Sequence, residues 1–108
     1  MNRHVLLVGR KESIIENVKK NLHAKDVTLH GGTSIHDVRE VLEKEKIDLV
    51  IMGAGLDMET RCEMVKIIFS MSNSTTVHMK DEASGPEGML PFVRSILVGN
   101  VSAGRVEA

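Results

Sequence analysis

HVLLVG at residues 4–9 and IDLVIM at residues 47–52 are the two stretches that decide the fold of this chain. Each contains a nearly continuous apolar run followed by glycine, a pattern typical of a strand that is covered on both faces of its sheet. DVTLH at residues 26–30 and TTVHM at residues 75–79 alternate instead, as half-exposed edge strands do. The first and third strands are therefore expected at the centre of a sheet, with the second and fourth at its edges.

The intervals between these strands carry helical apolar spacing. Ser13 and Glu16 have capping-box spacing at the start of the first helix. Ser34 and Asp37 are expected to cap the second helix, and Asp57 the third. Alternating strands and helices predict crossover connections and a parallel sheet. The expected fold is α/β, a three-layer αβα sandwich with a four-stranded parallel sheet in the order 2-1-3-4, which is flavodoxin-like with the fifth strand missing.

One further helix is expected near the end of the chain. Pro91 fits only the first turn of a helix, because proline lacks the N–H that later turns need. We expect this helix over residues 90–98, ended by Gly99. Residues 1–100 are then a single domain, and residues 101–108 are expected to form a flexible tail.

Composition narrows the class of protein. Hydrophobic residues make up 42% and charged residues 27% of the chain, as in globular domains, and no apolar run approaches the ~20 residues that cross a membrane. The net charge of −1 and the two aromatic residues, Phe69 and Phe92, do not favour nucleic acid as a partner. The chain shows no secretion signal, and the single Cys62 cannot form an intrachain disulfide, so a cytoplasmic location is expected.

Three stretches resemble the receiver domain of response regulators. VLLVGRKES at residues 5–13 resembles the first strand and acidic loop, and GTSIHDVREVLEKEKIDLVIMG at residues 32–53 resembles the second helix and third strand. Residues 56–80 are similar to the third helix and fourth strand. Residues 77–97 align with either the fourth or the fifth receiver strand, and in the second alignment Lys80 matches the switch lysine. One βα unit is missing in both alignments.

The residues that carry receiver chemistry do not occupy the matching positions. Gly9 and Arg10 stand where the family has the adjacent acidic residues that hold Mg²⁺, Gly53 replaces the phospho-accepting aspartate, and Lys80 replaces a Thr or Ser. Glycine and arginine neither hold a hard cation nor attack phosphorus. Asp57 follows four residues later, in an expected helix cap. We therefore expect a pseudo-receiver-like regulatory or protein-interaction module that is not phosphorylated and is not an enzyme.

The carboxyl ends of the central strands indicate an alternative, a small anion- or nucleotide-binding domain. Ligands of open α/β sheets bind beyond these ends, where the strand order reverses. The loops there are basic and rich in glycine, and backbone N–H groups beside cations favour an anion, although tight turns also require glycine. The predicted anion site comprises Gly9, Arg10, Lys11, Gly53, Gly55 and Lys80.

The third helix and the fourth strand indicate a protein interface. Apolar residues cover roughly 220° of this helix, about twice what packing on a sheet requires, and the fourth strand has no expected partner on its outer edge. A protein partner or self-association, such as a homodimer, is expected here, unless the last helix covers this surface by itself. The predicted interface comprises Met64, Ile67, Ile68, Met71 and Val77.

No metal, cofactor or catalytic residue is predicted. The five histidines share no metal-ligand spacing. The P-loop signature is absent, and the pair Gly53 and Gly55 lacks the third small residue of a dinucleotide fingerprint. Cys62 lies among apolar helix residues and is expected to be a small core residue.

Overall fold

The computed structural model describes residues 2–81 and 85–105. The elements follow one another as β1 (Arg3–Val8), α1 (Glu12–Asn21), β2 (Val27–Gly32), α2 (Ile35–Lys44), β3 (Leu49–Met52), α3 (Met58–Met71), β4 (Thr76–Met79), the 3₁₀ turn η1 (Pro86–Gly88) and α4 (Met89–Arg105).

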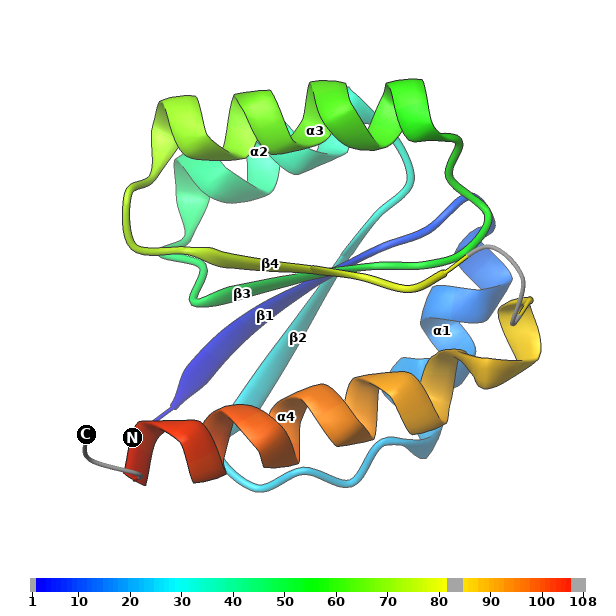
Figure 1. The fold of residues 1–108 in the computed structure, drawn as a ribbon, viewed down its shortest axis with the longest axis vertical. Helices are drawn as coiled ribbons and strands as arrows, with labels where there is room; N and C mark the ends of the chain where they lie inside the picture. Colours follow the sequence, from blue (N-terminus) through cyan, green and yellow to red (C-terminus); the bar gives the residue numbers. More distant parts are fainter. Residues whose placement is uncertain (1, 82–84, 106–108) are drawn as a thin grey trace.

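The four strands form one parallel sheet in the order β2-β1-β3-β4, which confirms the predicted fold. Val5 of β1 lies opposite Leu29 of β2 and Leu49 of β3. Figure 1 shows α2 and α3 on one face of the sheet, with α1 and α4 on the other. None of the described helices is long and apolar enough to cross a membrane.

The core consists of two layers, one on each side of the sheet. Val5 and Leu7 of β1 pack with residues of α1 and α4, whereas Leu6 and Val8 pack with residues of α2 and α3. All four side chains are fully buried. Burial of one such side chain stabilises a fold by about 1.5–3 kcal/mol. Consecutive apolar residues in a central strand therefore stabilise both layers.

Side-chain caps begin two of the helices as predicted. The Ser34 hydroxyl accepts the Asp37 N–H at 3.2 Å, and the Asp37 carboxylate accepts the Thr33 N–H at 2.9 Å. The Asp57 carboxylate accepts the Thr60 N–H at 2.8 Å. The predicted Ser13 cap is wrong, because α1 begins one residue earlier, at Glu12, and its cap position makes no side-chain hydrogen bond.

The second strand extends two residues beyond the predicted stretch, through Gly31 and Gly32. Gly31 pairs with Leu7, and Gly32 with Val8. A β-carbon added at Gly31 would lie 2.7 Å from Ile15 Cγ2 on α1. Glycine is therefore required here by the close approach of the helix to the sheet, and not by a turn.

The last helix is longer than predicted. It begins at Met89 and continues through Gly99 to Arg105, so residues 101–105 belong to α4 and not to a tail. A glycine inside a helix costs about 1 kcal/mol relative to alanine, which is not enough to end the helix. Residues 106–108, the rest of the predicted tail, lie outside the described residues.

Candidate functional site

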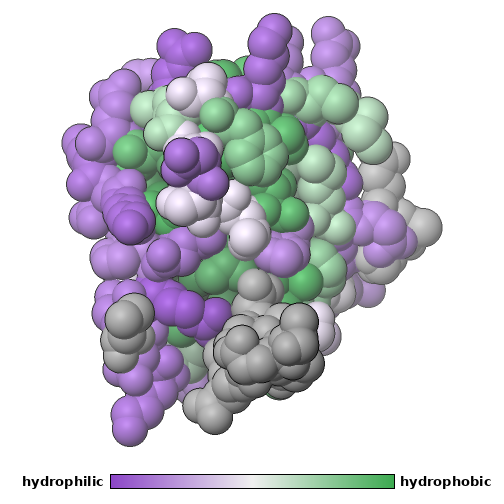
Figure 2. Space-filling view, turned by 60° about the vertical axis from the view of Figure 1, so that its left-hand side comes forward, coloured by the Kyte–Doolittle hydropathy of each residue, from purple (hydrophilic) through white to green (hydrophobic). Residues whose placement is uncertain are grey.

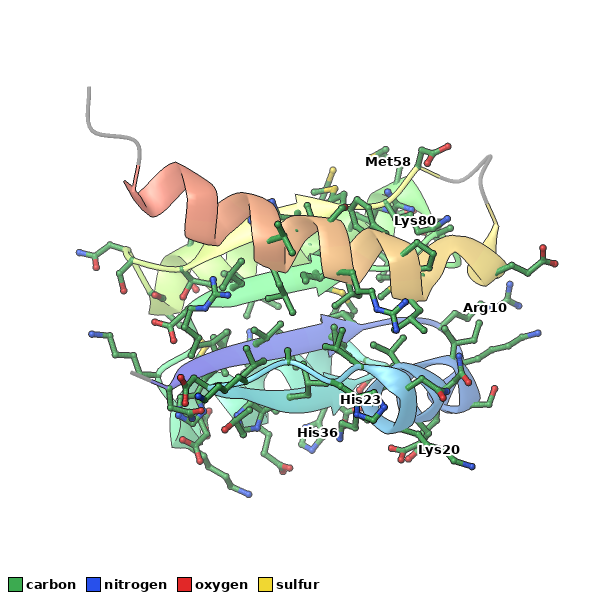
Figure 3. The ribbon with its side chains drawn as sticks, turned by 90° about the horizontal axis from the view of Figure 1, so that it is seen from below. Arg10, Lys20, His23, His36, Met58 and Lys80 are labelled. Atoms are coloured by element: carbon green, nitrogen blue, oxygen red, sulfur yellow. The ribbon has the colours of Figure 1, made fainter. Side chains whose placement is uncertain are left out.

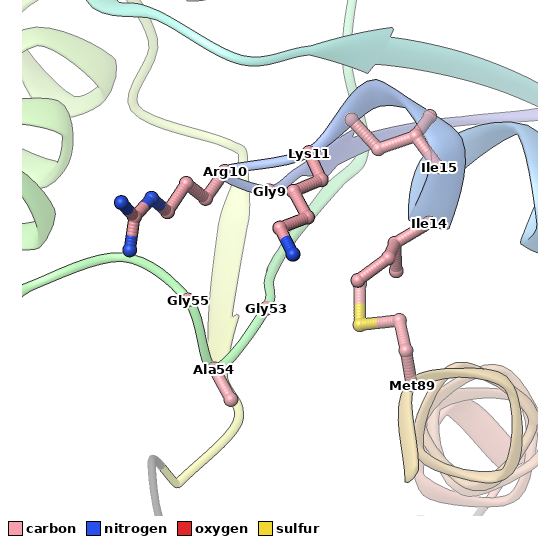
Figure 4. A pocket seen from close by; sticks show the side chains of 9 residues that line it. All are labelled: Gly9, Arg10, Lys11, Ile14, Ile15, Gly53, Ala54, Gly55 and Met89. Atoms are coloured by element: carbon pink, nitrogen blue, oxygen red, sulfur yellow. The ribbon is translucent and has the colours of Figure 1, made fainter. Parts of the chain in front are cut away.

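A cavity of about 210 Å³ opens at the carboxyl ends of β1 and β3, where the strand order reverses. Two loops and the first turns of two helices, α1 and α4, meet around it (Figure 4). Its lining residues are Gly9, Arg10, Lys11, Ile14, Ile15, Gly53, Ala54, Gly55 and Met89.

Two glycines in equivalent places leave the space for this cavity. The Gly9 N–H donates to the Gly32 carbonyl, and the Gly53 N–H donates to the Val8 carbonyl at 2.8 Å, so the sheet pattern extends one residue beyond each strand. A β-carbon at Gly53 would lie 3.5 Å from the Met89 sulfur, at ordinary contact distance. Larger side chains at these positions would occupy the cavity.

The structure brings five of the six residues of the predicted anion site to this cavity: Gly9, Arg10, Lys11, Gly53 and Gly55. Lys80 does not line it. Arg10 and Lys80 lie at the same end of the molecule (Figure 3), but the Lys80 side chain is buried, and its ammonium group donates to the Gly85 carbonyl. It packs against Gly88, because η1 folds over the end of β4.

Sequence reasoning did not include the apolar wall of the cavity. Ile14 and Ile15 come from the first turns of α1, and Met89 is the first residue of α4. Their periodicity indicated core positions, and Ile15 and Met89 do belong to the core beneath the cavity. The only available signal was that both helix starts follow directly after loops at the carboxyl edge.

A buried arginine supports the loop after β3. Arg61 of α3 is only 3% exposed, and its guanidinium donates to the Leu56 carbonyl at 2.9 Å and to the Gly53 carbonyl at 3.1 Å. A buried cation must find acceptors, and these two carbonyls supply them. In the sequence, the signal was a charged residue in register with Met64 and Ile68 on the buried face of α3.

The charges around the cavity are cationic. No carboxylate lines it in the described part of the chain. Asp57 is an exposed cap, and the Thr60 N–H that donates to it holds the pKa of its carboxyl below the ordinary value, with a smaller contribution from Arg10. Carboxylates line a separate hollow beside β2, which contains Glu12, Glu16 and Asp37.

Two histidines that are far apart in the sequence meet on the face of the sheet that carries α2. His4 Nδ1 lies 3.0 Å from His30 Nε2, and the rings are stacked. Burial and the neighbouring His4 lower the pKa of His30. Within residues 2–81 and 85–105, no group of three or more His, Cys, Asp or Glu residues is arranged to hold a metal ion.

The predicted interface is only partly at the surface. Met64 and Ile68 are buried against the sheet, which corrects their assignment, whereas Ile67 and Val77 are half-buried and Met71 is exposed. Met64 and Ile68 are buried because they belong to the face of α3 that packs on the sheet.

The exposed large apolar side chains of α3 and β4 are Met58, Phe69, Met71 and Met79. Cys62 is also exposed, and not a core residue, because it lies outside the buried face of α3. The alternative expectation, that the last helix covers this surface, is wrong, because α4 packs with α1 on the opposite face of the sheet. On the side of the molecule shown in Figure 2, hydrophobic side chains gather into a patch that hydrophilic side chains interrupt.

The three layers and the sheet order define a flavodoxin-like α/β domain with a cavity at its strand-order reversal. A scan of protein families finds no match to this chain, and neither a curated protein nor a solved structure matches it.

Proposed function

We propose that this chain is a non-catalytic, receiver-like regulatory or interaction module that does not undergo phosphorylation. The observation that carries the proposal is the set of residues at the crevice. Gly9, Arg10 and Gly53 lie where phosphotransfer would need carboxylates, and none of the described residues that line the cavity is acidic. Without clustered carboxylates, the described lining of the cavity offers no ligands for Mg²⁺ and no nucleophile for phosphorus.

Incubation with acetyl phosphate and Mg²⁺, followed by intact mass spectrometry, tests this proposal. We expect no phosphoryl adduct, under conditions in which a phosphorylatable receiver domain is labelled in parallel. Asp57 is the carboxylate to check, because it follows β3 and lies beside Arg10. An adduct that is lost in Asp57→Asn would overturn the proposal.

The same edge supports a second function, the binding of a small anion. Arg10 and Lys11 stand at a cavity whose described lining contains no carboxylate, and such a site favours negative charge. A ligand that binds only the native state raises its stability. We therefore expect an anion to raise the melting temperature of the wild-type protein, and this increase to shrink in Arg10→Ala and Lys11→Met. A full increase in both variants would place the anion elsewhere.

Contact with a protein partner is proposed at the end of α3 and along β4. Phe69 is 53% exposed and Met71 40% exposed at the end of α3, and β4 is the last strand of the sheet. An edge strand beside exposed apolar side chains favours association. We propose that the protein binds this partner in a reducing cytoplasm, where the exposed Cys62 thiol would stay reduced. Sedimentation as a monomer at high micromolar concentration would exclude a homodimer.

A further inference from the structure

The size of the cavity limits what it can hold. At about 210 Å³ it is somewhat larger than the ~150 Å³ that accommodates benzene and smaller than the ~300–1,000 Å³ of pockets for drug-sized ligands. Ile14, Ile15 and Met89 supply an apolar wall, in which the methionine can adapt to the shape of a ligand. These dimensions suit one ring or one branched alkyl group, and they leave no room for an enclosed nucleotide.

The loop after β3 is oriented by Arg61. The carbonyls of Gly53 and Leu56 both point to this guanidinium, which lies on the α3 side of the sheet. In a trans peptide, the N–H points opposite to the carbonyl of the preceding residue. The Ala54 N–H therefore points away from Arg61, toward the side on which α1 and α4 lie.

That direction leads into the cavity, whose wall includes Ala54 itself. Within residues 2–81 and 85–105, the N–H groups of Ala54 and Gly55 donate to no protein acceptor. The Ala54 N–H is therefore available to donate to an anionic oxygen of a bound ligand.

The two cations at the rim differ in direction. Figure 4 shows the Lys11 side chain crossing the opening between Gly53 and Ile14, whereas Arg10 turns away over Gly55. Arg61 adds a third positive charge, behind the loop, and no described carboxylate forms an ion pair with it. The Lys11 ammonium is directed at the cavity, and the Arg61 guanidinium makes the loop behind it electropositive. We expect such a site to match a ligand with a single negative charge.

We infer that the cavity binds a small organic monoanion, an aromatic or branched-chain carboxylate. Its apolar body would lie on Ile14, Ile15 and Met89, and its carboxylate would meet the Lys11 ammonium and the Ala54 N–H. This inference rests on the proposed anion-binding function and specifies the ligand class for it. Both charge-assisted hydrogen bonds and burial of the apolar body contribute to binding.

Titrations with benzoate, benzamide and inorganic phosphate, followed by backbone amide NMR, test the ligand class. We expect saturable shifts with benzoate that are centred on the amides of Gly9, Ala54 and Gly55. Benzamide keeps the ring and loses the charge, so we expect it to bind about tenfold more weakly, the effect of one charge-assisted hydrogen bond. Inorganic phosphate lacks the apolar body and is expected to bind more weakly still.

Two variants test the placement of the ligand. Lys11→Met keeps an apolar stem and removes the charge, and it is expected to weaken benzoate binding about tenfold. Lys20→Met makes the same change on the exposed surface of α1 (Figure 3) and should leave binding unchanged. Gly53→Ala adds a methyl group at ordinary contact distance from Met89 and should lower affinity without loss of thermal stability.

The possible failures are distinguishable. Saturable phosphate binding at these amides with no benzoate binding would overturn the inferred ligand class and leave the anion-binding function in place. Equal affinity for benzamide and benzoate would overturn both, because the cavity would then be indifferent to charge. Unchanged benzoate affinity in Lys11→Met and Gly53→Ala would place the ligand elsewhere and overturn the inference.

Discussion

Substitution of Gly31 by alanine tests the packing between α1 and the sheet. The new β-carbon would lie 2.7 Å from Ile15 Cγ2, whereas the nearest Lys19 atoms are at 3.6 Å. Ile15 is only 2% exposed and packs in the α1 and α4 layer of the core, so it cannot move out to solvent without leaving these contacts. Either Ile15 leaves its preferred rotamer or α1 moves away from β2.

Overpacking of this kind costs about 1–3 kcal/mol. The opposing gain, from the reduced freedom of the unfolded chain, is about 0.4–1 kcal/mol. We therefore expect Gly31→Ala to lower the free energy of unfolding by about 1–2 kcal/mol, the balance of these two effects. Because 1 kcal/mol corresponds to roughly 4–8 °C for a domain of this size, the melting temperature should fall measurably.

Gly9→Ala is the matched control, because it adds a methyl group against the same side chain. Its β-carbon would lie 3.7 Å from Ile15 Cγ1, at ordinary contact distance, so we expect unchanged or slightly higher stability. Urea unfolding followed by far-UV circular dichroism measures both variants. In an Ile15→Leu background, which lacks Cγ2, the cost of Gly31→Ala should shrink. Equal stability of the two alanine variants would refute the packing argument.

Three further predictions concern caps, pH and a buried hydroxyl. Ser34→Ala should lower the free energy of unfolding by about 1 kcal/mol, and Ser13→Ala should not, because only Ser34 caps a helix; equal urea midpoints would contradict this. Burial, with the neighbouring His4, lowers the pKa of His30 below 6.5, so the unfolded state binds more protons and stability should fall as pH drops below about 6.5. His30→Gln should flatten that slope in urea titrations at several pH values, and an unchanged slope would exclude His30 as its source. Thr75→Val removes a buried 2.6 Å hydrogen bond to the Ile47 carbonyl and should cost about 1–3 kcal/mol, whereas Thr75→Ser should recover most of the loss in thermal unfolding.

The strand order was predictable because consecutive apolar residues indicate a strand that is buried on both faces. Leu6 and Leu7 both lie in the core, on opposite faces of β1, and only a strand covered on both sides needs both to be apolar. The pairing of Gly31 was not predictable in the same way. Its requirement for glycine comes from Ile15, which lies 16 positions earlier in the chain and approaches it only after α1 has packed.

The residues of the candidate site also fall into a predictable and an unpredictable group. Gly9, Lys11 and Gly53 were predictable because the ends of parallel strands meet at one edge of the sheet. The prediction that Lys80 belongs to the anion site was wrong, because the environment of Lys80 depends on how η1 folds back over β4. Arg61 was missed because its partners are carbonyl groups, which no residue type reveals.

Helix α3 joins two separate surfaces of the molecule through a single rigid body. Arg61, near its beginning, holds the carbonyls behind the cavity, and Phe69 and Met71, near its end, are exposed. The 14 residues of this helix span about 21 Å at 1.5 Å per residue. A shift of the helix along its axis would therefore rotate the Ala54 peptide at one end as it moved the aromatic ring at the other.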